Sequence, residues 1–483
     1  MIYLFWSLPL VAIGLLMASG RVSSVGAGLS GAVLAGLVAL AAAPVPMTAF
    51  DVATAAAKGL WLAWLVAAVI LAGLFFRDIV SGDDGRARPP PAGPEDRRRR
   101  AFAACFLVGP FAEAATGFGV GQVATIAMLR GIGLAPLHVV LLALFSQILV
   151  PWGAMANGTL VGAEFAGLSP RELGTSSAIL SVPLLAIWLA LFWRMAKAAG
   201  LEGSGRLLAT ELAWVLATAV LLILTNRQLG PEIAALVALG PLIVLQFWRD
   251  ERPDRAAWLS TLRVGLPYAG LIAGLAASRG IPALADGLGH AAALRPFADS
   301  PAWLPLLHPG SWLLAVGLVT ALVSGRRRAI GPAAGSVWRN GRNSVLTIAV
   351  YLVVARIMAD SGIAAALALG LRQVLGPFAA LATPWLAGTF GFLTGSGNAS
   401  NGLLMTSQAG IASDGRIPLA WIAAIQNTAA AALTMLSPAR VAMGCALVGH
   451  RELERAVYRK AWPLGAAPLV ALSILAALFI IGS

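Results

Sequence analysis

Residues 388–402 read Gly-Thr-Phe-Gly-Phe-Leu-Thr-Gly-Ser-Gly-Asn-Ala-Ser-Asn-Gly, a run of small and polar residues between two apolar stretches. The flanking stretches, 379–393 and 403–411, are each shorter than the roughly 20 helical residues that cross a bilayer. Polar backbone at membrane depth is tolerated only where it lines a cavity or is covered by protein. The pattern therefore predicts a helix that enters the membrane, breaks and returns.

A second interruption of the same character lies upstream at 111–121, which reads Phe-Ala-Glu-Ala-Ala-Thr-Gly-Phe-Gly-Val-Gly. Broken helices are where secondary transporters bind substrate. We expect two re-entrant hairpins, one at about 101–135 and the other at about 379–412. Two such segments in one polytopic chain suggest a carrier.

The composition excludes a soluble protein of this size. The chain has 483 residues, of which 59% are hydrophobic and 11% are charged, and this predicts an all-α, polytopic membrane protein. We expect one transmembrane domain over residues 1–483. The net charge is +13, and the basic residues behind it lie in short loops. This placement indicates a positive-inside bias rather than a nucleic-acid partner. The Pro- and Arg-rich loop at about 77–100 is expected to be a disordered cytoplasmic linker, whose Arg97–Arg100 run fixes topology or touches anionic lipid.

The apolar periodicity predicts about twelve spans, with both termini outside. With this arrangement, 24 Lys and Arg lie in cytoplasmic loops and 7 in outer loops. A hairpin that crossed the membrane would swap all downstream loops and lose this bias, so the charges support two hairpins that do not cross. The hairpins then enter from opposite sides, as in an inverted repeat. The predicted spans lie near 2–20, 25–43, 58–76, 138–157, 174–193, 207–225, 231–248, 264–279, 310–325, 344–360, 417–438 and 461–482.

The tip of the second hairpin is the stronger candidate for a binding site. Its glycines let backbone N–H groups approach a ligand, and a half-helix that starts there offers a positive dipole end to a carboxylate. Close helix packing is the alternative, because small residues also serve that purpose in membranes. The candidate substrate-binding residues at this tip are Thr394, Gly395, Ser396, Asn398, Ser400 and Asn401.

The first hairpin contributes Thr116, Gly117 and Gly119 as weaker counterparts, and it carries Glu113. A carboxylate at membrane depth is costly, and burial favours its protonated form. Glu113 is therefore a candidate for proton coupling. The alternative is a structural ion pair, with Arg130 or Arg440 as the partner.

Polar residues within the spans complete the candidate set. Gln147, Asn427 and Thr428 either bind substrate or form interhelical hydrogen bonds. Arg440 keeps its charge at any physiological pH, so it neutralises the substrate, pairs with Glu113 or snorkels to the surface. No metal site is expected, and no cofactor either, because the proton gradient would drive transport. The predicted partners are a small organic anion, protons and the lipid bilayer; a homodimer is left open.

Several motifs of the chain match a known family in order. They are Phe111-Ala-Glu-Ala-Ala-Thr-Gly-Phe-Gly119 through Trp152-Gly-Ala-Met155, Leu229-Gly-Pro-Glu232, Phe392-Leu-Thr-Gly-Ser396, Asn398-Ala-Ser-Asn401, and Gln426-Asn-Thr428 through Leu436-Ser-Pro438. These segments resemble the L-lactate permease family. The resemblance implies a proton symporter of lactate, glycolate or a related small monocarboxylate in the bacterial inner membrane, and not an enzyme. A membrane-embedded enzyme or an anion channel is the alternative.

The chain departs from the family pattern at the expected site. Gly397 and Asn398 stand where the family has an Asp-Thr pair, and Thr434 stands where it has a Lys. A new cation, Arg440, follows after Thr434. These differences predict that the chain prefers an acid other than L-lactate, or one in addition to it.

Overall fold

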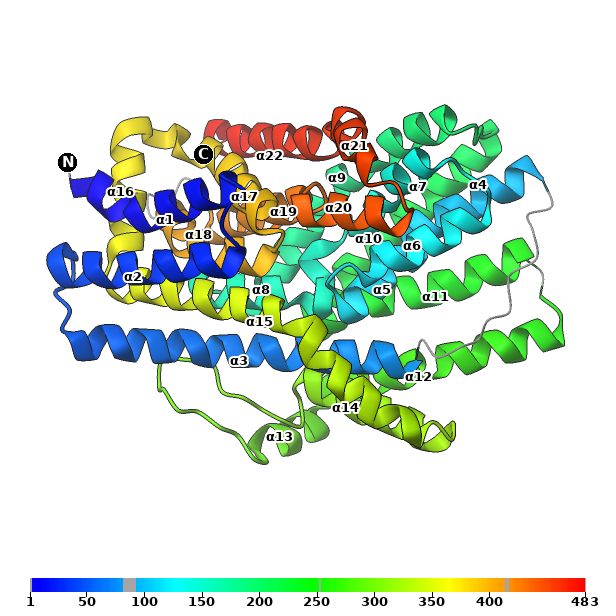
Figure 1. Cartoon of the computed structure of the whole chain (residues 1–483), viewed down its shortest axis with the longest axis horizontal. Helices are drawn as coiled ribbons and strands as arrows, with labels where there is room; N and C mark the ends of the chain where they lie inside the picture. The colour runs from blue at the N-terminus through cyan, green and yellow to red at the C-terminus, as the bar shows by residue number, and fades with distance from the viewer. Residues whose placement is uncertain (1, 81–92, 252, 413–416, 483) are drawn as a thin grey trace.

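The computed structural model describes residues 2–80, 93–251, 253–412 and 417–482, and shows a helical protein (Figure 1). Within these ranges the extended pairing is limited to one bridge, between Leu294 and Trp303. An all-helical chain suits a membrane, because each helix satisfies its own backbone hydrogen bonds. The predicted all-α class is confirmed.

The helices of the first half include a hairpin and an interrupted helix. They are α1 (Ile2–Ala18), α2 (Ser24–Ala42), α3 (Ala49–Val80), α4 (Pro94–Phe102), η1 (Ala103–Val108), α5 (Gly109–Thr116), α6 (Val120–Gly131), α7 (Pro136–Ala143), η2 (Leu144–Gln147), η3 (Val150–Trp152), α8 (Gly153–Ala166), α9 (Pro170–Ala198), α10 (Gly205–Leu229) and α11 (Pro231–Glu251).

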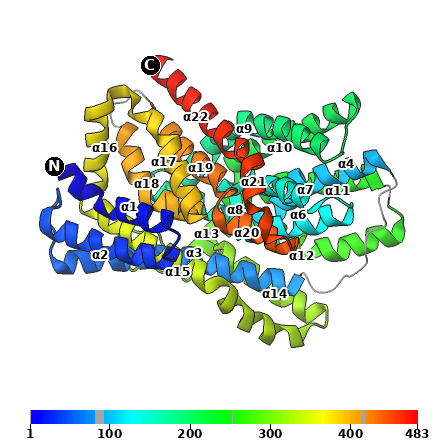
Figure 2. The same cartoon turned by 45° about the horizontal axis from the view of Figure 1, so that its top comes forward.

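The second half repeats the order of a hairpin followed by an interrupted helix. Its elements are α12 (Arg255–Gly280), α13 (Pro282–His290), α14 (Pro309–Val323), η4 (Arg327–Ala329), α15 (Ile330–Asp360), α16 (Ile363–Leu375), η5 (Gly376–Phe378), α17 (Ala379–Thr394), α18 (Gly397–Ile411), α19 (Leu419–Thr434), α20 (Pro438–Leu447), η7 (Arg451–Leu453), α21 (Glu454–Ala461) and α22 (Pro463–Gly482). Helix α16 runs across the direction shared by α2, α3 and α15 (Figures 1 and 2).

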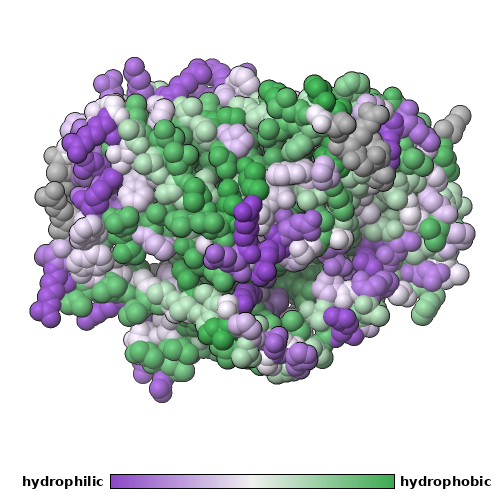
Figure 3. Space-filling view, turned by 180° about the vertical axis from the view of Figure 1, so that it is seen from behind, coloured by the Kyte–Doolittle hydropathy of each residue, from purple (hydrophilic) through white to green (hydrophobic). Residues whose placement is uncertain are grey.

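Ten helices of the described chain are long and apolar enough to cross a membrane, or eleven if a bent pair is counted as one span. The chain is thus a multi-pass membrane protein, and one face of it is largely apolar, with polar residues towards the ends and in a central patch (Figure 3). The expected count of twelve is not confirmed. Two predicted spans, 2–20 and 310–325, correspond to helices of only 17 and 15 residues. Conversely, the first arm of the second hairpin belongs to a helical run, Ile363–Thr394, that is long and apolar enough to cross a membrane.

Both predicted hairpin segments break at their polar runs. Helix α5 ends at Thr116 and α6 begins at Val120, while α17 ends at Thr394 and α18 begins at Gly397. In the second break, Gly395 takes a left-handed backbone (φ 64°) that favours glycine, and the Ser396 side chain accepts a hydrogen bond from Ala399 N at 3.4 Å. The inverted, non-crossing orientation of the two hairpins stays a prediction.

The predicted span 138–157 is not a straight helix. Its two parts, Pro136–Gln147 and Val150–Ala166, meet at an angle of 59°. Pro151 lacks the N–H needed to continue the helix, and short 3₁₀ turns replace α-helix on both sides of the break. The second half has a matching interruption between Thr434 and Pro438.

Glycines allow the closest helix crossings. A Cβ atom on Gly59 of α3 would lie 2.7 Å from Val353 Cα in α15, and one on Gly391 of α17 would lie 2.1 Å from the Ala430 carbonyl oxygen in α19. Helices in lipid gain no hydrophobic free energy by associating, so close packing has to hold them together. Small residues at the crossings let the two backbones approach. The α17–α19 crossing therefore sets the position of the second hairpin.

We expect Gly391→Ala to destabilise the protein by about 1–3 kcal/mol, the usual cost of overpacking, because its methyl group meets backbone that cannot rotate away. The measurement is thermal unfolding of purified protein in detergent. Gly270→Ala in α12 is the matched control, since a Cβ there meets nothing within 4 Å and alanine favours the helix. Equal stability of the two variants would contradict the crossing.

The Arg97–Arg100 run is helical and forms specific contacts. Arg98 in α4 is 1% exposed and lies 2.7 Å from Glu211 of α10, so this side chain of the run does not touch lipid, while the role of the run in fixing topology stays a prediction. The neighbours Arg99 and Arg100 pair with acids one turn earlier. The predicted disordered loop at 77–100 is thus helical at both ends, 77–80 and 94–100, and residues 81–92 lie outside the described residues.

A cluster of charges ties the loop before α14 to the helix bundle. Asp299 lies 2.6 Å from Lys58 of α3 and 2.8 Å from Arg356 of α15. The Lys58 hydrogen bond lowers the pKa of the Asp299 carboxyl group, so this acid stays ionised. Arg356 also pairs with Asp360, at 3.0 Å, and with Glu164 of α8, at 3.8 Å. The cluster joins α8, which carries part of the candidate site, to α3 and α15.

Candidate functional site

The two hairpin tips meet the two interrupted helices at one polar centre. A Cβ on Gly117 of the first tip would lie 2.6 Å from Ala154 Cβ, at the start of α8. A Cβ on Gly158, one turn further along α8, would lie 3.3 Å from Asn398 Oδ1 at the second tip. Helix α8 thus contacts both tips, although the tips are far apart in sequence.

At the first tip, Glu113 forms an ion pair with Arg440. The shortest distance is 3.0 Å, from Arg440 Nη2 to Glu113 Oε1. The same carboxylate accepts hydrogen bonds from Gly119 N at 3.1 Å and Gly121 N at 3.0 Å. Of the two partners considered for Glu113, the structure therefore places Arg440 beside it, whereas Arg130 donates to the Leu447 carbonyl.

The glycines of this tip permit that arrangement. Gly119 has a left-handed backbone (φ 88°), and a Cβ on it would lie 2.5 Å from Arg440 Nη1. A Cβ on Gly121 would lie 2.3 Å from the Gly109 carbonyl oxygen. Thr116 is less available to bind substrate than its position in the sequence suggested, because its hydroxyl already donates to the Ala112 carbonyl within the helix at 2.9 Å.

At the second tip, one predicted side chain lacks a partner. Asn398 is 8% exposed and makes no hydrogen bond with the described residues. Thr394 donates to the Phe390 carbonyl at 2.6 Å, and Ser396 caps α18. Of the side chains at this tip, Asn398 is therefore the most available to hydrogen-bond a ligand.

The remaining polar residues of α18 are packed inside the protein. Asn401 donates to the Gly158 carbonyl and to Asn427 Oδ1, both at 2.8 Å. Asn427 in turn donates to Thr159 and Ser177 at 3.0 and 2.9 Å. This chain of amides and hydroxyls holds α18, α19, α8 and α9 together.

Three other predicted residues take supporting positions. The Ser400 hydroxyl donates to the Ala387 carbonyl at 3.0 Å and so ties the two arms of the second hairpin. Thr428 donates within its own helix, to Ala424 at 2.7 Å. Gln147 is 1% exposed and donates to Ser146, while its Oε1 lacks a partner among the described residues.

Two features of the centre were not predicted. Ala154, Met155 and Ala156 have left-handed backbones, with φ of 48°, 56° and 59°, in a region that costs an L-residue roughly 1–2 kcal/mol. Ser437, just before α20, is 1% exposed, and its hydroxyl has no partner among the described residues. The only sequence signal for Ser437 was its place in the Leu436-Ser-Pro438 motif.

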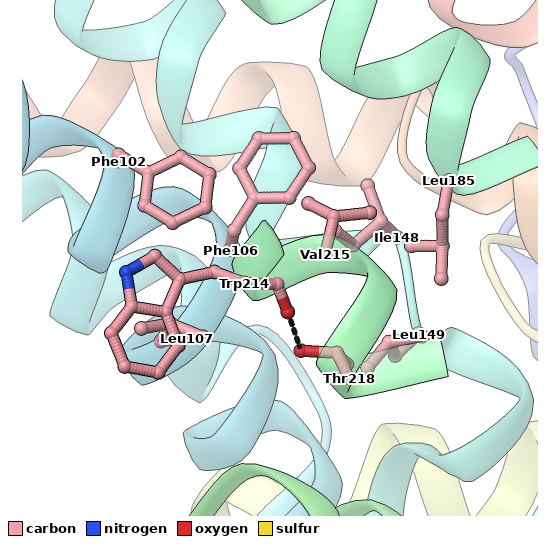
Figure 4. Close-up of a pocket in the computed structure, with 9 residues that line it drawn as sticks. All are labelled: Phe102, Phe106, Leu107, Ile148, Leu149, Leu185, Trp214, Val215 and Thr218. Carbon is pink, nitrogen blue, oxygen red and sulfur yellow. Dashed lines mark hydrogen bonds between the residues drawn. The ribbon is translucent and has the colours of Figure 1, made fainter. Parts of the chain in front are cut away.

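A separate small pocket lies among α10, η1 and the α7–α8 break (Figure 4). Its lining is apolar apart from Thr218, whose hydroxyl donates to the Trp214 carbonyl. It is distinct from the polar centre, because none of its lining residues belongs to either hairpin tip. The residues around it are Phe102, Phe106, Leu107, Ile148, Leu149, Leu185, Trp214, Val215 and Thr218.

Comparison with known proteins places the chain among permeases. The family model described as L-lactate permease matches residues 3–257 and 304–481. The chain is 26% identical to Glycolate permease GlcA of Escherichia coli K12, over 93% of this chain and 90% of that protein. It is 27% identical to the L-lactate permease of Salmonella typhimurium LT2, over 83% and 81%, and 23% identical to that of Streptococcus iniae, over 75% and 80%.

Proposed function

The chain belongs to the L-lactate permease family, and from this premise we propose that it is a proton-coupled carrier of small 2-hydroxy monocarboxylates, with lactate and glycolate as the first candidates. Family membership indicates a transporter rather than an enzyme and, with the apolar helices, a multi-pass protein of the bacterial inner membrane. The relatives are named for L-lactate and glycolate, which supports this substrate class.

The Glu113–Arg440 pair, which links the first hairpin to the first turn of α20, is the observation that carries the proposal. A monocarboxylate needs one compensating cation in a low-dielectric site, and Arg440 is a permanent one. Arg440 is paired with Glu113 at 3.0 Å in the structure. A proton on Glu113 cancels the charge of that carboxylate and makes Arg440 available to an incoming anion.

Coupling follows from this competition. Substrate and ionised Glu113 compete for one guanidinium, so substrate binds together with a proton. When substrate leaves on the other side, Glu113 loses its proton and recovers Arg440. The proton gradient is then the driving force, without a cofactor.

The test is uptake into liposomes containing the purified protein, with a pH gradient and a panel of L-lactate, D-lactate, glycolate and pyruvate. We expect uptake of at least one 2-hydroxy acid that requires the gradient. The replacements at Gly397, Asn398 and Thr434 motivate the expectation that L-lactate is not the best substrate. Failure to take up any acid of the panel would refute the proposed function.

We expect Asn398→Ala to lower substrate affinity and Asn401→Ala to lower the stability of the fold. The Asn398 side chain lacks a partner among the described residues, so its loss should weaken substrate binding about 10- to 150-fold, the equivalent of one hydrogen bond to a charged ligand, and leave stability unchanged. Asn401 bonds Gly158 and Asn427, so its loss should cost about 1–3 kcal/mol of stability. Thermal unfolding and calorimetric titration with the best substrate measure both; the reverse pattern would show that Asn398, not Asn401, supports the fold.

A further inference from the structure

The first turn of α20 contacts both hairpin tips. Ser437 precedes this helix and Arg440 follows three residues later, so both side chains lie on one side of the helix start, as in a capping box. A Cβ on Gly395 of the second tip would lie 3.1 Å from Ser437 Oγ, and one on Gly119 of the first tip would lie 2.5 Å from Arg440 Nη1. This single turn is where the two tips come together.

The hydroxyl of Ser437 is the group at this turn that the fold leaves unexplained. It is 1% exposed, its Oγ has no partner among the described residues, and it makes no capping bond to α20. A buried polar group without a partner is unfavourable, and serine at a helix start would ordinarily cap it. The orientation of Ser437 towards the second tip is thus unexplained by the fold, which indicates a bond to a bound molecule.

We infer that the substrate carboxylate binds at this turn, accepting a hydrogen bond from Ser437 Oγ and neutralised by Arg440. The N–H of Ala439 has no intrahelical acceptor in the first turn, and the helix start carries partial positive charge, so both favour an anion. This assignment rests on the proposed function and specifies its chemistry: the site takes one carboxylate of a small acid, close to both tips.

Ser437→Ala tests the hydroxyl. Calorimetric titration of the full-length protein in nanodiscs with L-lactate and with glycolate should show affinity reduced at least about 10-fold. The melting temperature without ligand should stay the same or rise, because the hydroxyl has no partner among the described residues. Unchanged affinity for both acids, or a lower melting temperature, would overturn the assignment.

Ser407→Ala is the matched control. Ser407 is also buried, and its hydroxyl also lacks a partner among the described residues, but it lies about 15 Å along α18 from the tip by helical rise. Its affinity for both acids should equal that of the wild type. An equal loss in the two variants would mean that any buried hydroxyl produces the effect, and would overturn the assignment of Ser437.

The role of Arg440 is tested in the Glu113→Gln background. In that protein the partner carboxylate is already gone, so removing the arginine leaves no unpaired acid. Glu113→Gln with Arg440→Gln should lose the preference for L-lactate over its neutral amide, lactamide, that Glu113→Gln alone retains. Retention of that preference in the double variant would overturn the role of Arg440. Wild-type protein that transports none of the acids would refute the proposed function and this inference together, whereas normal wild-type transport with unaffected variants would refute this inference alone.

Discussion

Glu113→Gln is expected to abolish uphill substrate accumulation driven by a pH gradient while exchange of labelled substrate survives. Glutamine keeps the size of Glu113 and can still accept a backbone hydrogen bond, but it cannot titrate. It also leaves Arg440, 3.0 Å from Glu113 in the wild type, permanently available to the substrate. Exchange needs no net proton release, so only coupling is lost. Counterflow and gradient-driven uptake in the same liposomes measure the two activities.

The structural alternative gives the opposite pattern. If Glu113 serves only to neutralise Arg440, the single variant leaves an unpaired cation, and folding or expression falls. Adding Arg440→Gln would then restore expression. Glu232→Gln is the control, because Glu232 also pairs with an arginine, Arg279 at 3.7 Å, but at the start of α11. Wild-type accumulation by Glu113→Gln would refute both roles.

Arg98→Ala is expected to produce the largest loss of stability, about 3–5 kcal/mol, as for other buried pairs from which one partner is removed. Arg98 and Glu211 have side chains only 1% and 2% exposed. Arg98 also donates to the Leu201 carbonyl at 2.7 Å and lies 4.9 Å above the Phe192 ring centre. Its removal leaves the buried Glu211 carboxylate without its counter-ion, with only the hydrogen bond from Trp193 Nε1 at 2.7 Å, and it frees α4, which leads into the first hairpin.

Thermal unfolding in detergent and the yield of monodisperse protein measure this effect. The neighbouring pair provides the control: Arg99 and Glu95 are 3.3 Å apart, with side chains 37% and 61% exposed, so Arg99→Ala should cost at most about 0.5 kcal/mol. Arg98→Met with Glu211→Leu removes both charges and should recover much of the loss. A small effect of Arg98→Ala, similar to that of Arg99→Ala, would mean that the buried pair does not anchor α4.

The sequence predicted the breaks well because their cause is local. Runs of glycine, serine and asparagine between short apolar stretches cannot continue a membrane helix, whatever surrounds them. The pairing of Glu113 with Arg440 was foreseen as one of several options, since two opposite charges at membrane depth favour each other. Arg356 and Asp360 pair at 3.0 Å for an equally local reason, because they lie four residues apart on one helix.

What was missed depends on contacts between distant segments. The position of Ser437 beside the candidate site could not be predicted, because it depends on the first turn of α20 contacting both hairpin tips. The left-handed run at Ala154–Ala156 has no sequence signal, since alanine favours right-handed helix. Arg98 sits in a run of four arginines typical of a loop, and only its burial against Glu211 reveals its role. The number of spans could not be fixed because a hairpin arm and a short span have the same apolar composition.

The Glu113–Arg440 pair also has an electrical consequence. Under the proposed mechanism, the empty carrier holds one carboxylate and one guanidinium, which together have no net charge. The loaded carrier holds a protonated Glu113, the same guanidinium and one substrate anion, and this set is neutral as well. Moving one elementary charge through the membrane potential is worth about 2.3 kcal/mol per 100 mV, but neither form offers a charge for it to act on. The voltage of the cell would therefore neither drive nor oppose this carrier, and the pH difference alone would set how far its substrate accumulates.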